Sequence, residues 1–257
     1  MDDDKKKYWH PTMQGVAGGY PRSMYRCCGY TDEELRRPLI GVVTAFLEAH
    51  PGSRALQEQS AAVKAGIWMA GGTPVEFHTV AICDAVAQGP GMSYSLPSRE
   101  LVAAEVEIVT GAHPFDGLVF LSCCDKSAPG MLMGGVRADL PAIFLPPGPM
   151  LARKEDGRVL VLSDIKEAMG ELKAGKISPE EFDHVERTAC ASLGVCSVMG
   201  TGMTVACLEE VLGLTLPGAS TLPAVDSRRL ALAKETGMRA VSLAKEGERL
   251  SRFLTPA

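Results

Sequence analysis

The sequence is poor in aromatic side chains, in basic excess and in long apolar runs, and the last two shortages each exclude a class of protein. Phe, Trp and Tyr make up 5% of the 257 residues. The 26 Lys and Arg are outnumbered by 31 Asp and Glu, and a net charge of −5 argues against a nucleic-acid-binding surface. No apolar run approaches the roughly 18 residues of a membrane span, and residues 1–5 (MDDDK) start no signal peptide. We therefore expect a cytoplasmic protein that binds neither nucleic acid nor membranes.

Cysteine, by contrast, is abundant, with eight residues. A disulfide framework is typical of small exported proteins, and this chain is neither short nor supplied with a signal segment. No Cys-x-x-Cys pair occurs, which argues against a zinc ribbon or a thioredoxin-like motif. Four cysteines fit buried apolar filling: Cys27, Cys28, Cys83 and Cys207. The other four lie in segments typical of loops, where redox, nucleophilic and metal-ligand roles are open: Cys123, Cys124, Cys190 and Cys196.

Short apolar runs alternate with helical patterns along the first 150 residues. The apolar runs predict buried strands at 39–47, 75–82, 116–121 and 141–145. The helical patterns predict helices at 54–70, 98–111 and 129–138, the second with Ser98 as its N-cap. This alternation is typical of βαβ units. The sequence therefore predicts an α/β fold, with a parallel sheet flanked by helices on both faces.

The second part of the chain is more polar and more helical. We expect a hairpin or loop at 155–157 and a helix opened by the capping box at 178–181, SPEE. Additional carboxy-terminal helices are predicted at 201–212 and 226–250. No internal repeat marks a second domain. We expect residues 1–257 to form a single domain, with 1–20 as a flexible or arm-like start.

Two of the predicted strands end in the same kind of residues. The second is followed by Cys83 and Asp84, and the third by Cys124, Asp125 and Lys126. Ligands of a parallel sheet bind outside the carboxyl ends of its strands, which would bring both aspartates within reach of one cation. Paired carboxylates suit Mg²⁺, whereas a thiolate suits zinc, copper(I) or an iron–sulfur cluster. The alternative is that both aspartates are solvated helix caps beside buried thiols.

Two long motifs resemble those of the dihydroxy-acid and 6-phosphogluconate dehydratases. Residues 124–133, CDKSAPGMLM, are similar to the family motif C-D-K-x-x-P-G-M-L-M. Residues 91–100, GMSYSLPSRE, are similar to G-M-x-Y-S-L-P-S-R-E. Further similarity lies at 71–77, 141–144, 148–150 and 209–218. The resemblance runs in order from about residue 22 to the last residue, and motifs of this length make a chance match negligible.

The resemblance implies the amino-terminal domain of a hydro-lyase. Such enzymes remove water from a 2,3-dihydroxy acid, either a branched-chain acid of amino-acid biosynthesis or a sugar acid, and yield a 2-keto acid. By motif position, Cys124 and Cys196 correspond to ligands of an iron–sulfur cluster, of the 2Fe–2S or 4Fe–4S type. Asp84, Asp125 and a carbamylated Lys126 correspond to ligands of Mg²⁺, which also makes Lys126 a catalytic residue. Iron would act as a Lewis acid on the departing hydroxyl, while Mg²⁺ would acidify the C2–H bond.

The sequence departs from the family pattern near the implied cluster. Many members have a third cluster cysteine where this chain has Gly52, although some also have glycine there, with a different type of cluster expected. Cys123 and Cys190 are close enough in sequence to serve as substitute ligands. Leu193 replaces the middle cysteine of the branched-chain enzymes, and residues 201–204, TGMT, replace their T-A-N-S stretch. These changes leave the choice between the two substrate classes open.

Family members are more than twice as long as this chain, so we expect their β-rich carboxy-terminal domain to be absent. That domain carries a further Mg²⁺-ligating glutamate and the serine base at C2, so we expect turnover to need a separate carboxy-terminal half as partner. Dimers are the rule in the family, and a homo-oligomer, a dimer or higher, is therefore expected. The alternative is a non-catalytic iron–sulfur-binding or regulatory paralogue. The departures favour this alternative, and the retained Mg²⁺ ligands oppose it.

Overall fold

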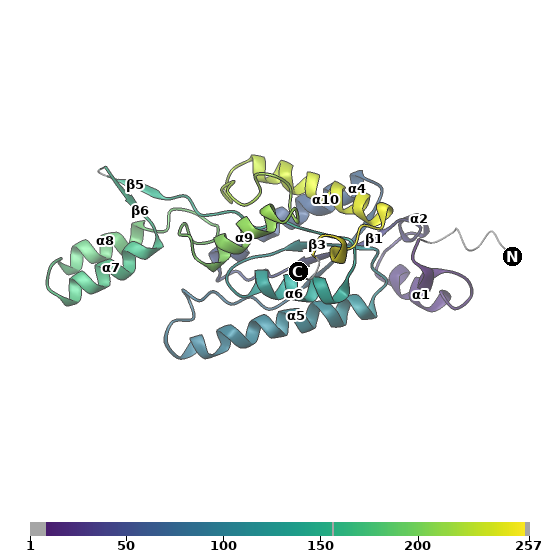
Figure 1. Cartoon of the computed structure of the whole chain (residues 1–257), viewed down its shortest axis with the longest axis horizontal. Coiled ribbons are helices and arrows are strands. Elements are labelled where there is room, and N and C mark those ends of the chain that lie inside the picture. The colour runs from purple at the N-terminus through teal and green to yellow at the C-terminus, as the bar shows by residue number, and fades with distance from the viewer. Residues whose placement is uncertain (1–8, 156, 255–257) are drawn as a thin grey trace.

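A four-stranded parallel sheet forms the centre of the molecule (Figure 1). The structure is a computed structural model that describes residues 9–155 and 157–254. The strands are β1 (Leu39–Thr44), β2 (Thr73–His78), β3 (Gly117–Leu121) and β4 (Ala142–Phe144). They lie in the order β2-β1-β3-β4, and all three pairings between them are parallel. This sheet confirms the predicted α/β fold.

The two central strands are buried along their whole length. Every residue of β1 and β3 is buried, and Val42 lies opposite Val119 in the register of the two strands. Continuous apolar strands of this kind are typical of a parallel sheet with both faces covered. The chain passes from β1 to β2 on one side and later places β3 on the other side of β1. This reversal creates a crevice outside the carboxyl ends of β1 and β3.

Two helix pairs cover the two faces of the sheet (Figure 1). On one face, α4 (Leu56–Met69) packs against α10 (Arg228–Glu246). On the other face, α5 (Ser95–Ala112) packs against α6 (Ser127–Ala138). The helices on both faces confirm the predicted layers. Among the described residues, no helix is both long and apolar enough to cross a membrane.

Glycines allow the two helices of each pair to approach closely. A Cβ atom on Gly66 of α4 would lie 2.0 Å from the carbonyl oxygen of Lys234 on α10. On the opposite face, a Cβ atom on Gly130 of α6 would lie 2.7 Å from the carbonyl oxygen of Arg99 on α5. Larger side chains at these two positions would separate the helices, because close-packed interiors have no spare space for them.

Smaller elements complete this central part of the molecule. They are η2 (Pro11–Met13), α1 (Gly19–Cys27), α2 (Asp32–Leu35), α3 (Pro51–Arg54), η3 (Gly89–Tyr94), α9 (Thr201–Val211) and η4 (Leu250–Arg252). Of the expected arm-like start at 1–20, residues 1–8 lie outside the described residues. From residue 9 onward, Met13 is fully buried in the core.

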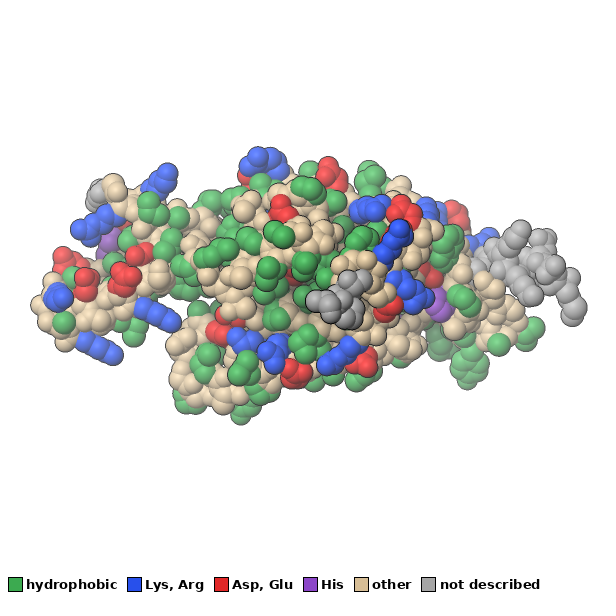
Figure 2. Space-filling view, viewed as in Figure 1, with side chains coloured by type: hydrophobic (Ala, Val, Ile, Leu, Met, Phe, Trp, Pro, Cys, Tyr) green, Lys and Arg blue, Asp and Glu red, His purple; other side chains and the backbone are tan. Residues whose placement is uncertain are grey.

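Residues 151–188 form an arm that extends away from the sheet (Figure 1). It consists of an antiparallel hairpin, β5 (Arg153–Glu155) and β6 (Arg158–Leu160), followed by α7 (Leu162–Lys173) and α8 (Pro179–Thr188). Ala168 is the one buried residue of α7, and α8 has none. Charged side chains of both signs are scattered over the visible face of the arm (Figure 2). The arm therefore packs mainly on itself.

Two predicted features of the arm are confirmed. The expected hairpin joins β5 to β6 at 155–157, although Asp156 itself lies outside the described residues. The capping box opens α8, because the Glu181 N–H donates to Ser178 Oγ at 3.1 Å and the Ser178 N–H donates to Glu181 Oε2 at 2.7 Å. The local pattern was sufficient here because a capping box involves only four consecutive residues.

Three boundaries near the site differ from the prediction. The first strand ends at Thr44 and not at residue 47. The second strand ends at His78 and not at residue 82, because its neighbour β1 ends at Thr44, which pairs with His78. The helix predicted to follow Ser98 begins earlier, at Ser95. Ser98 is therefore not its N-cap but lies inside the first turn, where its Oγ donates to the Ser95 carbonyl oxygen at 2.6 Å.

The last helix is shorter than predicted. It covers 228–246 instead of 226–250. Gly247 ends it with a φ of 68°, the left-handed conformation that commonly stops a helix at a glycine.

Candidate functional site

The loops that follow β1, β2 and β3 meet at the carboxyl edge of the sheet, beside a cavity of about 170 Å³. The walls of the cavity include His50, Cys83, Cys124, Cys190 and Cys196. The first three residues come from the three strand-end loops, and the last two follow α8. The cavity therefore lies where the topology of the sheet predicts a ligand site.

Three of these residues bring their ligand atoms together. A ring nitrogen of His50 and the Sγ atoms of Cys83 and Cys124 lie within 4.8 Å of one another. Cys83 is 8% exposed and Cys124 is 6% exposed, whereas Cys196 is half-buried. The structure thus places the two predicted cluster ligands, Cys124 and Cys196, on one cavity. It also places Cys83 there, which we expected to be apolar filling. The same expectation was wrong for Cys27 and Cys28, which are exposed at the end of α1.

The sequence contains a signal for Cys83, although this residue was expected to be apolar filling. Cys83 directly precedes Asp84, just as Cys124 directly precedes Asp125, so two strand-end loops carry the same Cys-Asp pair. In the structure, the N–H groups of Val86 and Ala87 donate to the Cys83 carbonyl oxygen at 3.0 and 2.9 Å. This turn holds Cys83 at the cavity.

His50 precedes α3, and its ring lies beside the thiols of Cys83 and Cys124. Its Nδ1 accepts hydrogen bonds from the backbone N–H groups of Gly52 at 3.1 Å and Ser53 at 3.2 Å. Burial lowers the pKa of His50, which favours the neutral ring. Because the two bonds occupy the Nδ1 lone pair, hydrogen bonding assigns the ring proton to Nε2. His50 therefore presents an N–H donor to the sulfur atoms.

Cys123 lies next to His50 but does not line the cavity. It is buried, and its Sγ is 3.6 Å from His50 Nε2. Burial raises the pKa of Cys123. Within the described part of the chain, Cys123 does not line the cavity, whereas Cys190, the other expected substitute ligand, does. Of these two candidates, Cys190 therefore lies at the cavity and Cys123 does not.

The thiols influence one another's ionisation. Hydrogen bonding with the Cys124 thiol lowers the pKa of Cys83, and the same interaction raises the pKa of Cys124. Burial, followed by the charge of Cys83, raises the pKa of Cys196 to about 11. Metal binding at this cavity therefore has to release protons from the thiols.

Asp84 and Lys126 form an ion pair beside the thiols. Lys126 Nζ lies 2.8 Å from Asp84 Oδ2, and Ser95 Oγ donates to Asp84 Oδ1 at 2.5 Å. The two side chains are only 21% and 15% exposed, Asp84 and Lys126 respectively. Burial opposes ionisation of Asp84, but hydrogen bonds from Lys126 and Ser95 outweigh it and hold the pKa of Asp84 below its usual value. Asp84 is therefore a fixed carboxylate at neutral pH.

In the turn between β3 and α6, three successive side chains point to three different places: the cysteine cavity, the start of α9 and Asp84. Cys124 has a φ of 29°, which is rare for a residue with a side chain, and it lines the cavity. Asp125 Oδ1 accepts a hydrogen bond from the Gly202 N–H at 3.0 Å, at the start of α9. Lys126 reaches Asp84. The predicted Mg²⁺ ligands thus lie on adjoining loops of one sheet edge.

A buried carboxyl group supports the end of β3. Glu209 of α9 is 1% exposed, and Ser122 Oγ lies 3.2 and 3.3 Å from its two carboxyl oxygens. Burial raises the pKa of Glu209 to about 8, so this group keeps its proton at neutral pH. Ser122 directly precedes Cys123 and Cys124. Glu209 therefore ties α9 to the loop that carries the thiols, a role that sequence reasoning did not assign.

The donor atoms fit the two metal groups that the resemblance implies. Cys83, Cys124 and Cys196 offer sulfur ligands around one cavity, and thiolates are the usual ligands of iron–sulfur clusters. Asp84 and Asp125 offer carboxylate oxygens, which suit Mg²⁺. The Lys126 ammonium supplies the positive charge beside Asp84 in this structure.

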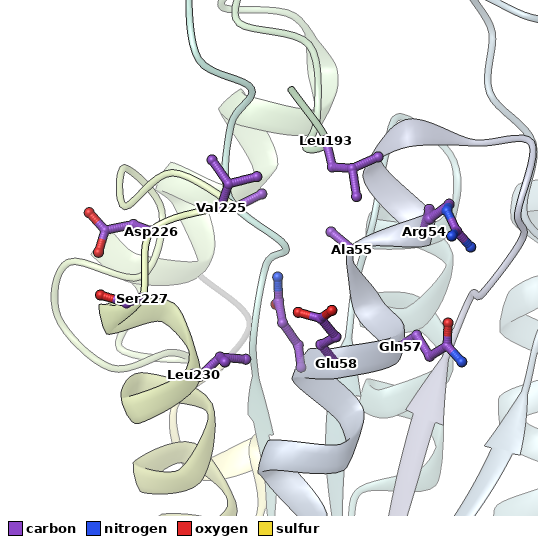
Figure 3. A pocket seen from close by; sticks show the side chains of 11 residues that line it. Arg54, Ala55, Gln57, Glu58, Leu193, Val225, Asp226, Ser227 and Leu230 are labelled. Carbon is purple, nitrogen blue, oxygen red and sulfur yellow. The ribbon is translucent and has the colours of Figure 1, made fainter. Parts of the chain in front are cut away.

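A second hollow, of about 320 Å³, lies between the α3–α4 segment and the start of α10 (Figure 3). Ala55 and Glu58 face Val225 and Leu230 across it (Figure 3). Its walls, as far as the structure describes them, contain no cysteine. Leu193, which replaces a family cysteine, lines this hollow and not the cysteine cavity. The candidate site is therefore the cysteine cavity with its neighbouring carboxylates.

Comparison with known proteins points to one family. The family model described as dihydroxy-acid/6-phosphogluconate dehydratase N-terminal matches residues 37–257. The dihydroxy-acid dehydratase of Caldanaerobacter subterraneus subsp. tengcongensis is 52% identical over 243 residues, which cover 94% of this chain and 44% of that protein. The dihydroxy-acid dehydratase of Clostridium pasteurianum is 49% identical over 243 residues, which cover 94% of this chain and 85% of that protein. The chain thus spans less than half of the first relative and most of the second.

Proposed function

The chain belongs to the dihydroxy-acid/6-phosphogluconate dehydratase family, and on this basis we propose that it is the iron–sulfur-binding part of a hydro-lyase. The proposed reaction removes water from a 2,3-dihydroxy acid and yields a 2-keto acid. One observation carries the proposal: the cysteine cavity lies directly beside the half-buried Asp84–Lys126 pair. Soft and hard metal ligands adjoin there at the edge of the sheet where α/β proteins bind their substrates.

The residues divide the work of metal binding between them. Cys124 and Cys196 would hold an iron–sulfur cluster, while Asp84 and Asp125 would hold Mg²⁺. Lys126 would join them after carbamylation, because a carbamate offers oxygen ligands and a negative charge, whereas an ammonium offers neither. The bound metals would supply Lewis acidity to the departing 3-hydroxyl and to the carboxylate and 2-hydroxyl of the substrate.

The remaining contacts keep these ligands in position. Ser95 donates a hydrogen bond to Asp84 and so orients its carboxylate. The Gly202 N–H does the same for Asp125. A site that is organised before substrate arrives spends less free energy on ordering during the reaction.

Turnover in this proposal requires the part of the family's length that this chain does not span. The Caldanaerobacter relative is matched over 44% of its length. The remaining portion, on the same polypeptide or on a second one, would supply the base at C2 and a further Mg²⁺ ligand. The working unit in this proposal is a homo-oligomer that acts on a small molecule.

The test is a dehydration assay under anaerobic conditions. The chain is loaded with iron, sulfide and Mg²⁺, combined with the carboxy-terminal part of the Caldanaerobacter relative, and given a branched-chain dihydroxy acid or a sugar acid. We expect one of the two to yield a 2-keto acid, with the rate at least about 100-fold lower in Asp84→Asn, which loses a metal ligand. Glu107→Gln, an exposed carboxylate on α5, is the matched control and should retain the rate.

The outcome also separates the two candidate functions. A complex that holds the cluster and Mg²⁺ but forms no keto acid from either substrate class would contradict the proposal. The non-catalytic iron–sulfur protein would then be the better account of the same site.

A further inference from the structure

We propose that Cys83 is a cluster ligand of this protein and that Cys83, Cys124 and Cys196 together form its ligand set. Cys83 would thus replace the cysteine that many family members have at the position of Gly52. The inference rests on the proposed function, because it assumes that the cavity holds an iron–sulfur cluster.

The sulfur positions are the first argument. The Cys83 and Cys124 Sγ atoms belong to the group of ligand atoms that lie within 4.8 Å of one another. Both thiols and Cys196 line the same cavity. Three thiolates on one cavity wall match the type of ligand that iron–sulfur clusters require.

The ion pair beside the thiols is the second argument. Asp84 follows Cys83, and Lys126 lies two residues after Cys124, so the 2.8 Å contact between Asp84 and Lys126 joins the two loops next to their cysteines. The contact is half-buried, and the turn at Val86 and Ala87 holds the Cys83 backbone. The position of Cys83 is therefore fixed by interactions outside the thiol itself.

The neighbouring donors are poorer ligands than Cys83. His50 would need a free ring nitrogen to bind iron, but Nδ1 accepts two backbone hydrogen bonds and Nε2 carries the proton. Cys123 is buried next to His50 and does not line the cavity. Cys190 lines the cavity but is exposed, in the segment that follows the arm.

The surroundings of Gly52 explain why either of two loops can supply the third thiolate. A Cβ atom on Gly52 would lie 3.1 Å from Val195 Cγ1, 3.2 Å from His50 Cε1 and 3.4 Å from Cys123 Sγ. Small shifts of these side chains would admit a cysteine, and Gly52 itself lines the cavity. A thiol at position 52 would therefore reach the cavity from the β1 loop, as Cys83 reaches it from the β2 loop.

The test is cluster binding by the full chain, without any requirement for turnover. Each protein is reconstituted anaerobically with iron and sulfide, and iron content, sulfide content, visible absorption and electron paramagnetic resonance of the reduced sample are measured. Cys83→Ala should lower bound iron at least about tenfold, as should Cys124→Ala. Cys207→Ala, a half-buried thiol on α9, and Cys123→Ala should keep the parent's iron content and spectra.

A rescue variant guards against loss of the fold. Gly52→Cys added to Cys83→Ala should restore most of the iron, because it supplies a thiol from the β1 loop. Circular dichroism of the metal-free proteins checks that all variants are folded. A folded Cys83→Ala protein with the parent's iron content and spectra would overturn the inference.

The result also distinguishes this inference from the proposed function. A parent chain that binds no cluster would overturn both. A parent that binds a cluster through Cys83, but supports no dehydration with its carboxy-terminal part, would leave this inference standing and remove the proposed reaction. Iron bound equally by the parent and Cys83→Ala, with dehydration intact, would remove this inference alone.

Discussion

The sheet with its helices and the arm of residues 151–188 differ in how they are stabilised. β1 and β3 are buried along their whole length, whereas the arm buries Ala168 in α7 and no residue of α8. Both regions nevertheless meet at the cysteine cavity. Leu162, the first residue of α7, lines it, together with Met150 just before the arm and Cys190 just after it.

This difference separates the cysteines into two kinds. Cys83 and Cys124 are on loops of the buried sheet, and Cys196 follows Val195, whose backbone pairs with Gly148 and Met150. Cys190 is exposed and lies next to the arm. Ligand positions that are set by a buried scaffold agree with a three-cysteine set that leaves Cys190 out.

The comparison predicts its largest effect at Arg229, in the buried region. Its guanidinium donates to the carbonyl oxygens of Pro146 at 2.9 Å, Ala219 at 2.8 Å and Leu222. Arg229→Ala leaves these groups without a partner, which should lower the free energy of unfolding of the metal-free chain by at least about 3 kcal/mol. Denaturant unfolding measures the change.

The neighbouring Arg228 provides the control for Arg229. Its side chain is 75% exposed and pairs with Asp226 at the surface. Arg228→Ala should leave the unfolding midpoint close to that of the parent, because exposed ion pairs contribute little. Equal decreases in the free energy of unfolding for Arg229→Ala and Arg228→Ala would contradict the expected difference between buried and exposed regions.

A smaller effect, dependent on pH, is predicted at Glu209. Burial raises the pKa of Glu209 to about 8 in the folded chain, above its usual value of 4.5. The folded state thus keeps a proton that the unfolded state releases, so this contribution to stability is complete below pH 4.5 and is lost as pH rises toward 8. Glu209→Gln should remove that loss.

Unfolding of both proteins at pH 5 and pH 8 tests this prediction. Relative to the parent, Glu209→Gln should gain up to about 3 kcal/mol between these two pH values. Asp116, whose pKa burial raises to about 7, affects both proteins equally and cancels in the difference. A difference that does not change with pH would show that Glu209 is ionised in the folded chain.

The smallest effect is predicted in the arm. Ser178→Ala removes the side-chain bond to the Glu181 N–H, which should destabilise α8 by about 1 kcal/mol. Because the arm packs mainly on itself, we expect faster hydrogen exchange in α7 and α8 and little change in the β1 and β3 amides. Thr31→Ala, which breaks the same kind of capping box in α2, is the matched variant in the central region. If Ser178→Ala reduced the hydrogen-exchange protection of β1 as much as that of α8, this would contradict the expectation that the arm opens separately from the sheet.

The parts of the fold that depend on local pattern could be predicted from the sequence. Buried strands are continuous apolar runs, and the capping box at Ser178 lies within four residues. The end of β2 at His78 could not be predicted, because it depends on where the neighbouring strand stops. Long-range contacts of this kind leave no periodic signal in the sequence.

The candidate site likewise has residues that could be predicted from the sequence and residues that could not. The motif around Cys124, and the positions of Asp84 and Asp125 after two strand ends, could be predicted from the sequence. Cys83 was not assigned, because its place at the cavity depends on the loop after β2 and on the contact between Asp84 and Lys126. Glu209 was missed for a similar reason, since its burial follows from the packing of α9 against the end of β3.

A crystal structure of the anaerobically reconstituted chain, with anomalous data recorded at the iron edge, tests the central claim most directly. The account predicts iron in the cysteine cavity, with the Sγ atoms of Cys83, Cys124 and Cys196 at bonding distance and His50 Nε2 unbound. Iron at another place, or iron in the cavity with Cys83 turned away from it, would contradict the account.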